Sequence, residues 1–564
     1  MDTLTDLITT AAERHGPCVA LTLVRERSSE CWTYADLYRY ARRVAQMVQA
    51  RGIAPGERVV IWAPNGPRWV GAFFGCVLAG VVVVPLDVKS TAAFVGKIAA
   101  QSEPRLAVAT RATTASLAAL GLPCVAVEDL DAALPEDDTS WGAVQVRPDD
   151  LAELIYTSGT TGAPKGVMLS HKNILSDLKA VYTFVPPGNT YRMLSLLPLS
   201  HMFEQIAELF YVLSVGASII YVDSLQPATI FRAMREEGVT GIPVVPQILA
   251  LFMSGLEREV KKAGKWRSWE RAHRLAPRLP LRARRLLFRA VHERLGRRLD
   301  FVFCGGAYLD PKLAQRWENL GVKVVIGYGT TEASPIITAN SFKRRNLHSV
   351  GRPIPCNEVR IAADGEILAR GPNIMKGYFN NPEATAQAID AEGWFHTGDI
   401  GEIDKDGFLK ITDRKKDIII NAYGKNIAPQ PLESLLKSSP YVGTPVLIGD
   451  RRKYVCALIV PNFEKLERDA AAMGIRFDSR EELVGDDRVK AIYQNEIDRF
   501  NRNLDRQEKI RRFALLPRDF TIEADEITPS LKVKRKVIDK KYKDIIDQLY
   551  ADEAGEEERE AKRA

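Results

Sequence analysis

Cysteine is scarce in this sequence and is nowhere paired. The 564 residues include seven cysteines, and no two of them are close enough to form a Cys-x-x-Cys pair. An odd number of widely spaced cysteines argues against a disulfide framework and against a zinc knuckle, and it favours a reducing compartment. The seven are Cys18, Cys31, Cys76, Cys124, Cys304, Cys356 and Cys456.

Long hydrophobic runs are also scarce. The longest, residues 69–86 (WVGAFFGCVLAGVVVVPL), is interrupted by three glycines and is closed by Pro85. Because a membrane-spanning helix needs about 20 apolar residues, we predict a buried helix followed by a buried strand instead. The first residues carry acidic side chains and no long apolar core, which argues against a signal peptide. These features predict a cytoplasmic protein. Peripheral contact with the inner face of a membrane is an alternative that stays open.

Excess positive charge is confined to one segment. The net charge is +7, yet residues 257–298 contain fifteen Lys or Arg and four Glu, a local charge of +11. Within this segment, residues 281–296 (LRARRLLFRAVHERLG) place apolar side chains at helical spacing, and Trp266 and Trp269 lie upstream. A basic amphipathic helix with aromatics suits an anionic membrane surface, and a helical cover over its own domain is the other interpretation. No recognised nucleic-acid-binding module accompanies the charge, so we expect no nucleic-acid partner.

Helix and strand patterns alternate through most of the chain. Thr33 is a candidate N-cap for a helix over residues 34–51, whose apolar residues recur at helical spacing, and Gly52 follows it. The next segment, residues 57–64 (ERVVIWAP), has the composition of a short buried strand, and similar units recur further along. Such alternation predicts an α/β fold, with a large N-terminal domain of mixed or parallel sheets and flanking helices.

The pattern changes after Gly351. Short alternating strands joined by Asp-Gly turns indicate hairpins, and residues 480–503 have the pattern of a helix. Between two apolar strands lies the charged stretch DRKKDI, which is a candidate hinge. We therefore expect an N-terminal domain over residues 1–412, a hinge over 413–418, a small mobile α+β C-terminal domain over 419–550, and a disordered tail over 551–564.

Residues 156–166 read YTSGTTGAPKG, in which hydroxyl side chains alternate with glycines and a lysine follows. Glycines let a backbone approach an anion, hydroxyls donate to phosphate oxygens and a lysine adds charge, so this composition predicts a phosphate-binding loop. The Gly-x4-Gly-Lys-Ser/Thr spacing of a Walker loop is absent, which disfavours a P-loop kinase. The alternative to a phosphate-binding loop is a solvent-exposed Gly/Thr turn that has no functional role. The candidate phosphate contacts are Thr157, Ser158, Gly159, Thr160, Thr161, Gly162 and Lys165.

Further motifs follow this loop. They are PLSHMFE (198–204), GYGTTEAS (327–334), GEILARGPNIMKGYFNNPEAT (365–385), GWFHTGDIGEIDKDGFLKITDRKKD (393–417) and GKNIAPQPLE (424–433). In this combination the chain resembles the adenylate-forming superfamily of acyl-CoA synthetases, firefly luciferase and peptide-synthetase adenylation domains. It is most similar to long-chain fatty acid:CoA ligases. The resemblance implies ATP and Mg²⁺ as cofactors, coenzyme A as co-substrate, and acyl-adenylate formation followed by thioester formation.

The resemblance also implies roles in the chemistry for individual residues. Glu332 matches the magnesium ligand, with Thr160 as its partner, and Thr331 matches a contact to the α-phosphate. Lys532, in TPSLKVKRK, matches the lysine that bridges the carboxylate and the α-phosphate, although a leucine replaces the commoner glycine before it. His201 matches a residue near the acyl carboxylate and the tunnel mouth, and a purely structural histidine is an equal alternative.

The nucleotide and coenzyme A contacts are implied in the same way. Tyr328 matches an aromatic that stacks on adenine, Asp399 matches a carboxylate that accepts from both ribose hydroxyls, and Arg414 matches a ribose or phosphate contact. Asp413 matches the hinge residue, and Gly424 lies where the pantetheine passes. The remaining contacts are Gly305, Gly306 and Ala307 on the other face of adenine, and Gly327, Gly329 and Thr330 beside the stacking tyrosine.

Alternatives to a long-chain fatty acid:CoA ligase stay open. A fatty acyl-AMP ligase would load a carrier protein, and a medium-chain or aryl acid:CoA ligase would take a different acid. A non-catalytic nucleotide-binding protein at a membrane surface would have lost catalytic residues, yet Lys165, Glu332, Asp399 and Lys532 are all present. Chain-length preference and oligomeric state are open, and a homodimer is one alternative.

Overall fold

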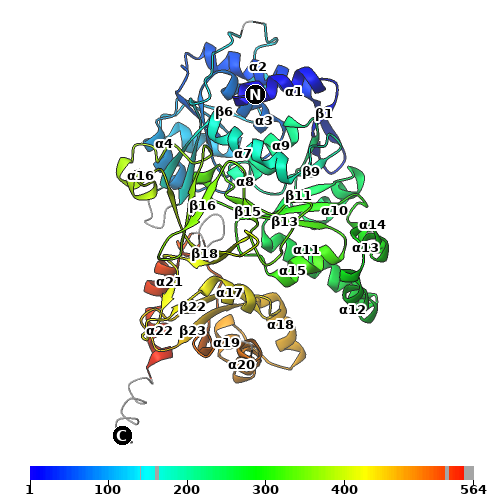
Figure 1. Ribbon diagram of the computed structural model, residues 1–564, viewed down its shortest axis with the longest axis vertical. Helices are drawn as coiled ribbons and strands as arrows, with labels where there is room; N and C mark the ends of the chain where they lie inside the picture. Colours follow the sequence, from blue (N-terminus) through cyan, green and yellow to red (C-terminus); the bar gives the residue numbers. More distant parts are fainter. Residues whose placement is uncertain (140, 159–163, 503, 522, 528–532, 552–564) are drawn as a thin grey trace, which may run out of the picture. The chain divides into compact units, whose positions relative to one another are not determined.

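The computed structural model describes residues 1–564 except 140, 159–163, 503, 522, 528–532 and 552–564. The chain divides into two compact units (Figure 1). Unit 1 consists of Met1–Thr397 and Glu402–Lys410, and unit 2 consists of Gly398–Gly401 and Ile411–Ala564. The expected hinge over 413–418 and the expected domain bounds stay predictions. The tail expected to be disordered lies, beyond Ala551, outside the described residues.

Unit 1 is built on two large, mainly parallel sheets, which confirms the predicted α/β class. The nine-stranded sheet has the order β15 (Arg352–Pro353), β14 (Thr338–Ala339), β13 (Lys323–Tyr328), β12 (Phe301–Cys304), β11 (Gly241–Val244), β9 (Arg192–Leu194), β10 (Ser218–Val222), β1 (Val19–Val24) and β2 (Ser29–Thr33). The six-stranded sheet has the order β6 (Cys124–Ala126), β5 (Leu106–Ala109), β3 (Arg58–Trp62), β4 (Val82–Pro85), β7 (Leu151–Ser158) and β8 (Pro164–Ser170).

Helices connect these strands and pack on them through three buried apolar clusters. They are α1 (Leu4–His15), α2 (Tyr34–Ala50), α3 (Pro67–Leu78), α4 (Ala92–Ser102), α5 (Arg111–Ala118), α6 (Leu130–Ala133), α7 (His171–Phe184), α8 (Met202–Glu204), α9 (Tyr211–Ser214), α10 (Pro227–Glu236), α11 (Pro246–Lys262), α12 (Trp266–Leu275), α13 (Leu281–Leu287), α14 (Arg289–Arg294), α15 (Pro311–Asn319) and α16 (Pro382–Ala388).

The predicted helix after Thr33 is confirmed as α2. The Thr33 hydroxyl accepts from the backbone of Asp36 at 3.1 Å, and the Asp36 carboxylate accepts from the backbone of Thr33 at 3.0 Å, so the two form a capping box. The apolar run 69–86 is the buried helix α3 followed by strand β4, as predicted. Gly75 of α3 lets that helix approach α2 closely, because a Cβ there would lie 2.4 Å from the Val44 side chain. No helix among the described residues is long and apolar enough to cross a membrane.

Two expected helices are each interrupted. The prediction of one helix over 480–503 is wrong because Asp486 caps a new helix, so that α19 (Arg480–Gly485) ends and α20 (Asp487–Asn501) begins. The basic stretch 281–296 divides into α13 and α14 at Phe288, whose ring is buried against Trp269, with 5.4 Å between ring centroids. Packing of that ring into the core, which helical spacing cannot reveal, determines the break.

Unit 2 has its own sheet and its own core. Its strands are β22 (Val442–Ile448), β23 (Val455–Pro461) and β24 (Ile510–Leu515), with a small pair of β20 (Ile419–Ile420) and β21 (Asn426–Ile427). Its other helices are α17 (Pro429–Leu436), α18 (Phe463–Ala472), α21 (Arg535–Lys541) and α22 (Lys543–Tyr550). The strands β16 (Glu358–Ile361) and β17 (Glu366–Arg370) belong to unit 1, whereas β18 (Phe395–Ile403) and β19 (Leu409–Arg414) each contain residues of both units.

Candidate active site

The predicted phosphate loop connects the two strands of a hairpin. β7 and β8 run antiparallel, and Thr157 lies directly opposite Lys165 where the strands enter and leave the loop. Two of the predicted phosphate contacts therefore meet at the mouth of the hairpin. Ser158 is the last residue of β7, and Gly159, Thr160, Thr161 and Gly162 lie outside the described residues, so their contacts stay predictions.

Glu332 lies on a short turn that follows β13. Its Oε1 accepts a hydrogen bond of 2.8 Å from the Tyr378 hydroxyl, and Nζ of Lys165 lies 4.8 Å from the centroid of the Tyr378 ring. The predicted phosphate lysine and the predicted magnesium ligand therefore contact the same tyrosine. Burial, and then the neighbouring Glu332 carboxylate, raise the pKa of the Tyr378 phenol, so the phenol stays protonated and donates.

The turn that carries Glu332 requires a glycine at its start. A Cβ on Gly329 would lie 1.8 Å from the carbonyl oxygen of Pro335, so no larger residue can replace this glycine. Thr331 begins the turn of 3-10 helix, and the hydroxyl of Thr330 before it is buried. Among the described residues that hydroxyl has no hydrogen-bond partner. A ligand or a water molecule can supply the missing hydrogen-bond partner of such a buried hydroxyl.

Buried amide and hydroxyl groups hold the far side of this turn. Nδ2 of Asn373 donates to the carbonyl oxygen of Ala333 at 2.8 Å, and the Ser334 hydroxyl donates to the carbonyl oxygen of Asn373 at 2.7 Å. The backbone N–H of Met375 donates to the carbonyl oxygen of Glu332 at 2.8 Å. These bonds fix the Glu332 backbone without using its carboxylate.

The two predicted walls of the adenine site lie on neighbouring strands. β12 and β13 are parallel and pair up to Cys304 and Ile326, so the residues that follow them emerge at the same sheet edge. An ideal Cβ on Gly305 would lie 3.5 Å from the carbonyl oxygen of Gly327, which shows how close the strands' ends are. The structure thus brings Gly305, Gly306 and Ala307 together with Gly327 and Tyr328.

His201 is exposed and lies at the N-cap position of the short helix α8, where its side chain makes no capping hydrogen bond within the described part of the chain. The residue two positions further, Phe203, places its ring 3.6 Å from an ideal Cβ on Gly305, so this turn lies beside the predicted adenine wall. A π-helix, Gln205–Phe210, follows α8 and is wholly buried. It contains Glu208, and burial raises the pKa of this carboxyl well above its usual range. The role of His201 at the acyl carboxylate stays a prediction.

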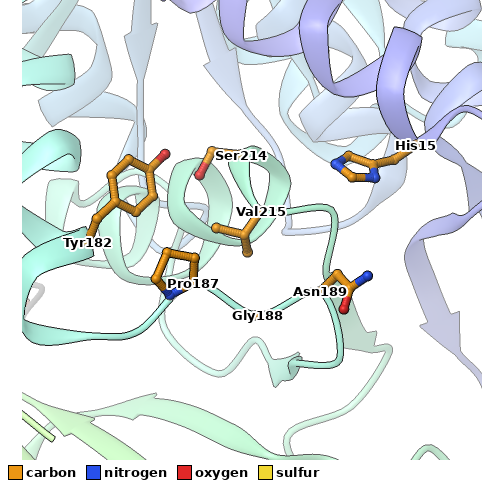
Figure 2. Close-up of a pocket in the computed structure, with 7 residues that line it drawn as sticks. All are labelled: His15, Tyr182, Pro187, Gly188, Asn189, Ser214 and Val215. Atoms are coloured by element: carbon orange, nitrogen blue, oxygen red, sulfur yellow. The ribbon is translucent and has the colours of Figure 1, made fainter.

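A surface hollow elsewhere in unit 1 has a different lining. His15 of α1 and Tyr182 of α7 lie at its opposite ends, and Val215 lies between them (Figure 2). None of the predicted site residues that the structure describes lines this hollow. The full lining is His15, Tyr182, Pro187, Gly188, Asn189, Ser214 and Val215.

In unit 2 the two predicted ribose contacts form an ion pair. Nε of Arg414 lies 3.3 Å from Oδ1 of Asp399, and the Asp399 side chain is buried while that of Arg414 is partly exposed. The backbone N–H of Lys415 donates to the carbonyl oxygen of Gly398 at 2.8 Å, which holds the two segments together. The structure therefore places these two residues side by side.

The predicted hinge residue, Asp413, is buried in unit 2. Its Oδ1 accepts from the backbone N–H of Arg414 at 2.6 Å, and burial raises the pKa of its carboxyl to about 7. Gly424 adopts φ of +72° in an exposed turn, a conformation that favours glycine. Among the described residues, no atom other than those of its chain neighbours lies within 4 Å of an ideal Cβ at Gly424, and its part in the pantetheine path stays a prediction. Lys532 lies outside the described residues.

Comparison with known families decides the class of this protein. The family described as AMP-binding enzyme matches residues 8–379, and the family described as AMP-binding enzyme C-terminal domain matches residues 416–554. The chain belongs to the AMP-binding enzyme family. A long-chain-fatty-acid–CoA ligase of this kind, FadD15 of Mycobacterium bovis, is 31% identical over 561 residues, which cover 92% of each chain.

Two further likenesses bear on fold and substrate. A feruloyl-CoA synthase of an Amycolatopsis species is 33% identical over 435 residues, covering 74% of this chain and 80% of its own. The structure of o-succinylbenzoate coenzyme A synthetase from Bacillus subtilis, in complex with ATP and a magnesium ion, has a TM-score of 0.73 at 23% identity. That likeness covers 94% of this chain and 98% of the other, and it shows that the fold is shared.

The Glu332 side chain is suited to a magnesium ion. Tyr378 occupies Oε1, and among the described residues nothing donates to Oε2. No group of three or more His, Cys, Asp or Glu in the described part of the chain could hold a metal ion. One carboxylate is consistent with Mg²⁺, which keeps waters and substrate phosphates among its ligands. Tyr378 and Asn373 were not predicted, although both lie in the motif 365–385, because their contacts are made with distant segments.

Proposed function

We propose that this chain is an ATP-dependent long-chain fatty acid:CoA ligase. In the first half-reaction the fatty acid carboxylate attacks the α-phosphorus of ATP, the bond to the terminal diphosphate breaks, and an acyl-adenylate and pyrophosphate form. In the second, the CoA thiol attacks the acyl carbon and loses its proton, and AMP leaves. The observation that carries this proposal is the placement of Lys165 and Glu332 at one tyrosine beside the phosphate-loop hairpin.

The first half-reaction needs positive charge on three phosphates and an aligned carboxylate. Lys165 supplies a fixed cation at the mouth of the loop, and Thr157 opposite it supplies a hydroxyl. Magnesium, held by Glu332 with Thr160, would add charge neutralisation on the phosphate oxygens. Thr331 would contact the α-phosphate, and Lys532 would bridge the attacking carboxylate and that phosphate.

Binding of the nucleoside follows from the edge formed by β12 and β13. Tyr328 would stack on one face of adenine, and the glycines after β12 would allow the other face to approach the backbone. Asp399 would accept from both ribose hydroxyls, and Arg414, its partner at 3.3 Å, would contact the ribose or a phosphate and orient that carboxylate. His201 would lie near the acyl carboxylate.

Thioester formation requires a second arrangement of the active site. We infer that residues 419–550 rotate about the hinge 413–418 relative to residues 1–412, so that Gly424 borders the pantetheine path. Asp413→Pro is then expected to spare pyrophosphate release and to block CoA consumption. Equal loss in both half-reactions, measured separately, would contradict a hinge at this position.

The acid is proposed to be a long-chain fatty acid. The relative FadD15 is named for that substrate, whereas the feruloyl-CoA synthase is named for an aryl acid. Pyrophosphate release from ATP and Mg²⁺ should therefore be measured with fatty acids of increasing chain length and with ferulate, before and after CoA is added. A preference for long chains with strict dependence on CoA supports the proposal. A preference for ferulate, or product formation only with a carrier protein, would replace it.

Peripheral membrane contact through residues 257–298 is a further part of the proposal. α13 buries none of its side chains, and Leu286 and Leu287 are 76% and 40% exposed. Exposed arginines on α12 and α13 lie in the same segment, whereas Arg284 and Arg285 donate to carbonyl oxygens of their own unit. Exposed leucines with arginines suit an anionic lipid surface.

Co-sedimentation with phosphatidylserine vesicles tests this contact. The wild-type protein should bind and should be released by salt, and Leu286→Ser with Leu287→Ser should bind more weakly. Leu120→Ser, at a leucine that is 51% exposed far along the sequence from this segment, is the matched control. Equal binding by all three proteins, or no salt-sensitive binding by the wild type, would exclude this surface.

A further inference from the structure

Tyr378 contacts two groups of opposite charge, the Glu332 carboxylate and the Lys165 ammonium. Its hydroxyl donates to Oε1 of Glu332 at 2.8 Å, and its ring lies 4.8 Å from Nζ of Lys165. Among the described residues neither Lys165 nor Glu332 forms an ion pair, although both contact the same side chain. Tyr378 itself is 8% exposed, so its ring cannot move aside without leaving the core.

The backbone on both sides of Tyr378 is fastened to the same two elements. The N–H of Phe379 donates to the carbonyl oxygen of Gly166 at 2.7 Å, and the N–H of Met168 donates to that of Gly377 at 3.0 Å, so this segment lies along β8. On the other side, Met375 is bonded to the backbone of Glu332 at 2.8 Å. The position of the tyrosine is therefore fixed relative to the strand that carries Lys165 and to the turn that carries Glu332.

We propose that Tyr378 is a positioning residue that keeps Lys165 and Glu332 apart and ready for a magnesium-bound triphosphate. The inference rests on the proposed function. The hydroxyl orients the carboxylate through Oε1 and leaves Oε2 for the metal. The face of the ring holds the ammonium by its quadrupole, which satisfies the cation without neutralising it. Without the tyrosine, the lysine and the glutamate can pair directly. The ammonium would then compete with the metal for the carboxylate, and the carboxylate would compete with the phosphates for the ammonium.

The hydroxyl and the ring have separable effects. Tyr378→Phe removes the bond to Glu332 and keeps the ring under Lys165, whereas Tyr378→Leu removes both contacts. Partners that orient a metal ligand typically change metal affinity by about 10–100-fold when removed. We therefore expect Tyr378→Phe to weaken binding of magnesium-ATP by about 10–100-fold and to leave binding of metal-free ATP unchanged. Tyr378→Leu should weaken both.

Isothermal titration calorimetry with ATP in Mg²⁺ and with ATP in EDTA tests these expectations. Tyr34→Phe is the matched control. Tyr34 lies in helix α2, and its buried hydroxyl donates to the carbonyl oxygen of Ala217 at 2.6 Å. It should bind both forms as the wild type does. Pyrophosphate release by Tyr378→Phe should need more Mg²⁺ for half-saturation and should reach the wild-type plateau, a rescue that a merely destabilised protein would not show.

The outcomes separate the inference from the function on which it rests. Wild-type binding of magnesium-ATP together with unchanged binding by Tyr378→Phe would overturn the inference and leave the ligase proposal intact. Equal losses for magnesium-ATP and metal-free ATP in Tyr378→Phe would overturn it also, because the hydroxyl would then not act through the metal ligand. A wild-type protein that binds no ATP would overturn both. If Tyr378→Phe unfolds at a lower temperature than Tyr34→Phe, Tyr378→Leu serves as a second variant. Its pyrophosphate release, titrated with Mg²⁺, then decides whether added metal restores activity.

Discussion

Charged residues at the proposed site of unit 1 are held differently from those next to the expected hinge in unit 2. Lys165 contacts an aromatic face, and Glu332 accepts from a phenol, so neither charge is cancelled by a described residue. In unit 2, Arg414 pairs with Asp399, and Arg535 pairs with Glu433 at 2.5 Å. Neutral partners leave charge available for a ligand, whereas a buried pair such as Arg535–Glu433 ties segments of the fold together.

The Arg535–Glu433 pair also shows how unit 2 fastens its last helices. Glu433 on α17 accepts from the backbone N–H of Leu447 at 2.6 Å, and Arg535 at the start of α21 donates to the carbonyl oxygen of the same leucine at 3.0 Å. The segment that contains Lys532 lies just before α21 in the sequence. The buried pair therefore ties the start of α21 to α17 and to Leu447 of β22.

The largest expected effect concerns this pair. Glu433→Ala leaves the Arg535 guanidinium buried without its partner, which typically costs about 3–5 kcal/mol. The free energy of unfolding of unit 2, followed by urea denaturation, should fall by that amount. Glu433→Met combined with Arg535→Met removes both charges and should recover most of the loss. Unchanged unfolding of the single variant would show that the pair does not stabilise unit 2.

A smaller effect is expected when Lys165 is replaced. Lys165→Met should lower acid-dependent pyrophosphate release by roughly a hundredfold, in the range seen when one preorganised electrostatic contact is lost, and it should not change the unfolding midpoint. Lys323 is the matched control, because its ammonium lies 5.2 Å from the Phe342 ring and also pairs with Asp300 at 2.6 Å.

Lys323→Met should have the opposite profile, with about 1 kcal/mol lost from the free energy of unfolding and pyrophosphate release retained. If the two variants behave alike, the distinction between a cation kept for a ligand and a cation kept for stability fails.

The stability of the protein is expected to depend on pH through Asp413. The pKa of Asp413 is about 7 in the folded protein against 3.8 ordinarily, so folding favours its protonated form. Its contribution to stability is therefore fully present below about pH 4 and is lost as pH rises through 7. Asp413→Asn, which is always neutral, should be more stable than the wild type at pH 8 by about 1–3 kcal/mol and should lose this advantage at pH 4. Thermal unfolding between pH 4 and 8 measures the difference, and an advantage independent of pH would contradict it.

The smallest effect is expected at Arg414, whose side chain is 42% exposed. An ion pair with one exposed partner typically contributes about 0.2–1 kcal/mol, so Arg414→Ala should barely change the unfolding midpoint. It should nevertheless raise the KM for ATP severalfold, because the Asp399 carboxylate loses the group that orients it. Steady-state kinetics at varied ATP would show this, and a large loss of stability with an unchanged KM would assign Arg414 to structure alone.

Local patterns predicted much of the fold. Helical spacing and the Thr33 cap gave α2 nearly to the residue, and the glycine-interrupted run 69–86 gave α3 and β4. The breaks at Phe288 and Asp486 were missed, since one depends on a ring buried against Trp269 and the other on the side chain of Asp486, which caps a new helix.

The candidate site was predicted only where a motif marks it. Glu332 and Lys165 were proposed from motifs, and the structure brings them together, although their roles stay predictions. Tyr378 carries no local signal, because a tyrosine after a glycine in a short extended segment has many structural uses. Its partner Glu332 lies 46 positions away in the sequence, and only folding brings the two side chains together.

Glu332 is expected to support transfer of the adenylyl group of ATP to a fatty acid. The most direct measurement is pyrophosphate release by the wild type and by Glu332→Gln, with ATP, Mg²⁺ and a long-chain fatty acid and without CoA. We expect release by the wild type only when the acid is present, and a loss of about a hundredfold or more in the variant at an unchanged unfolding midpoint. Wild-type rates in Glu332→Gln, or no release by the wild type with any acid, would contradict the account.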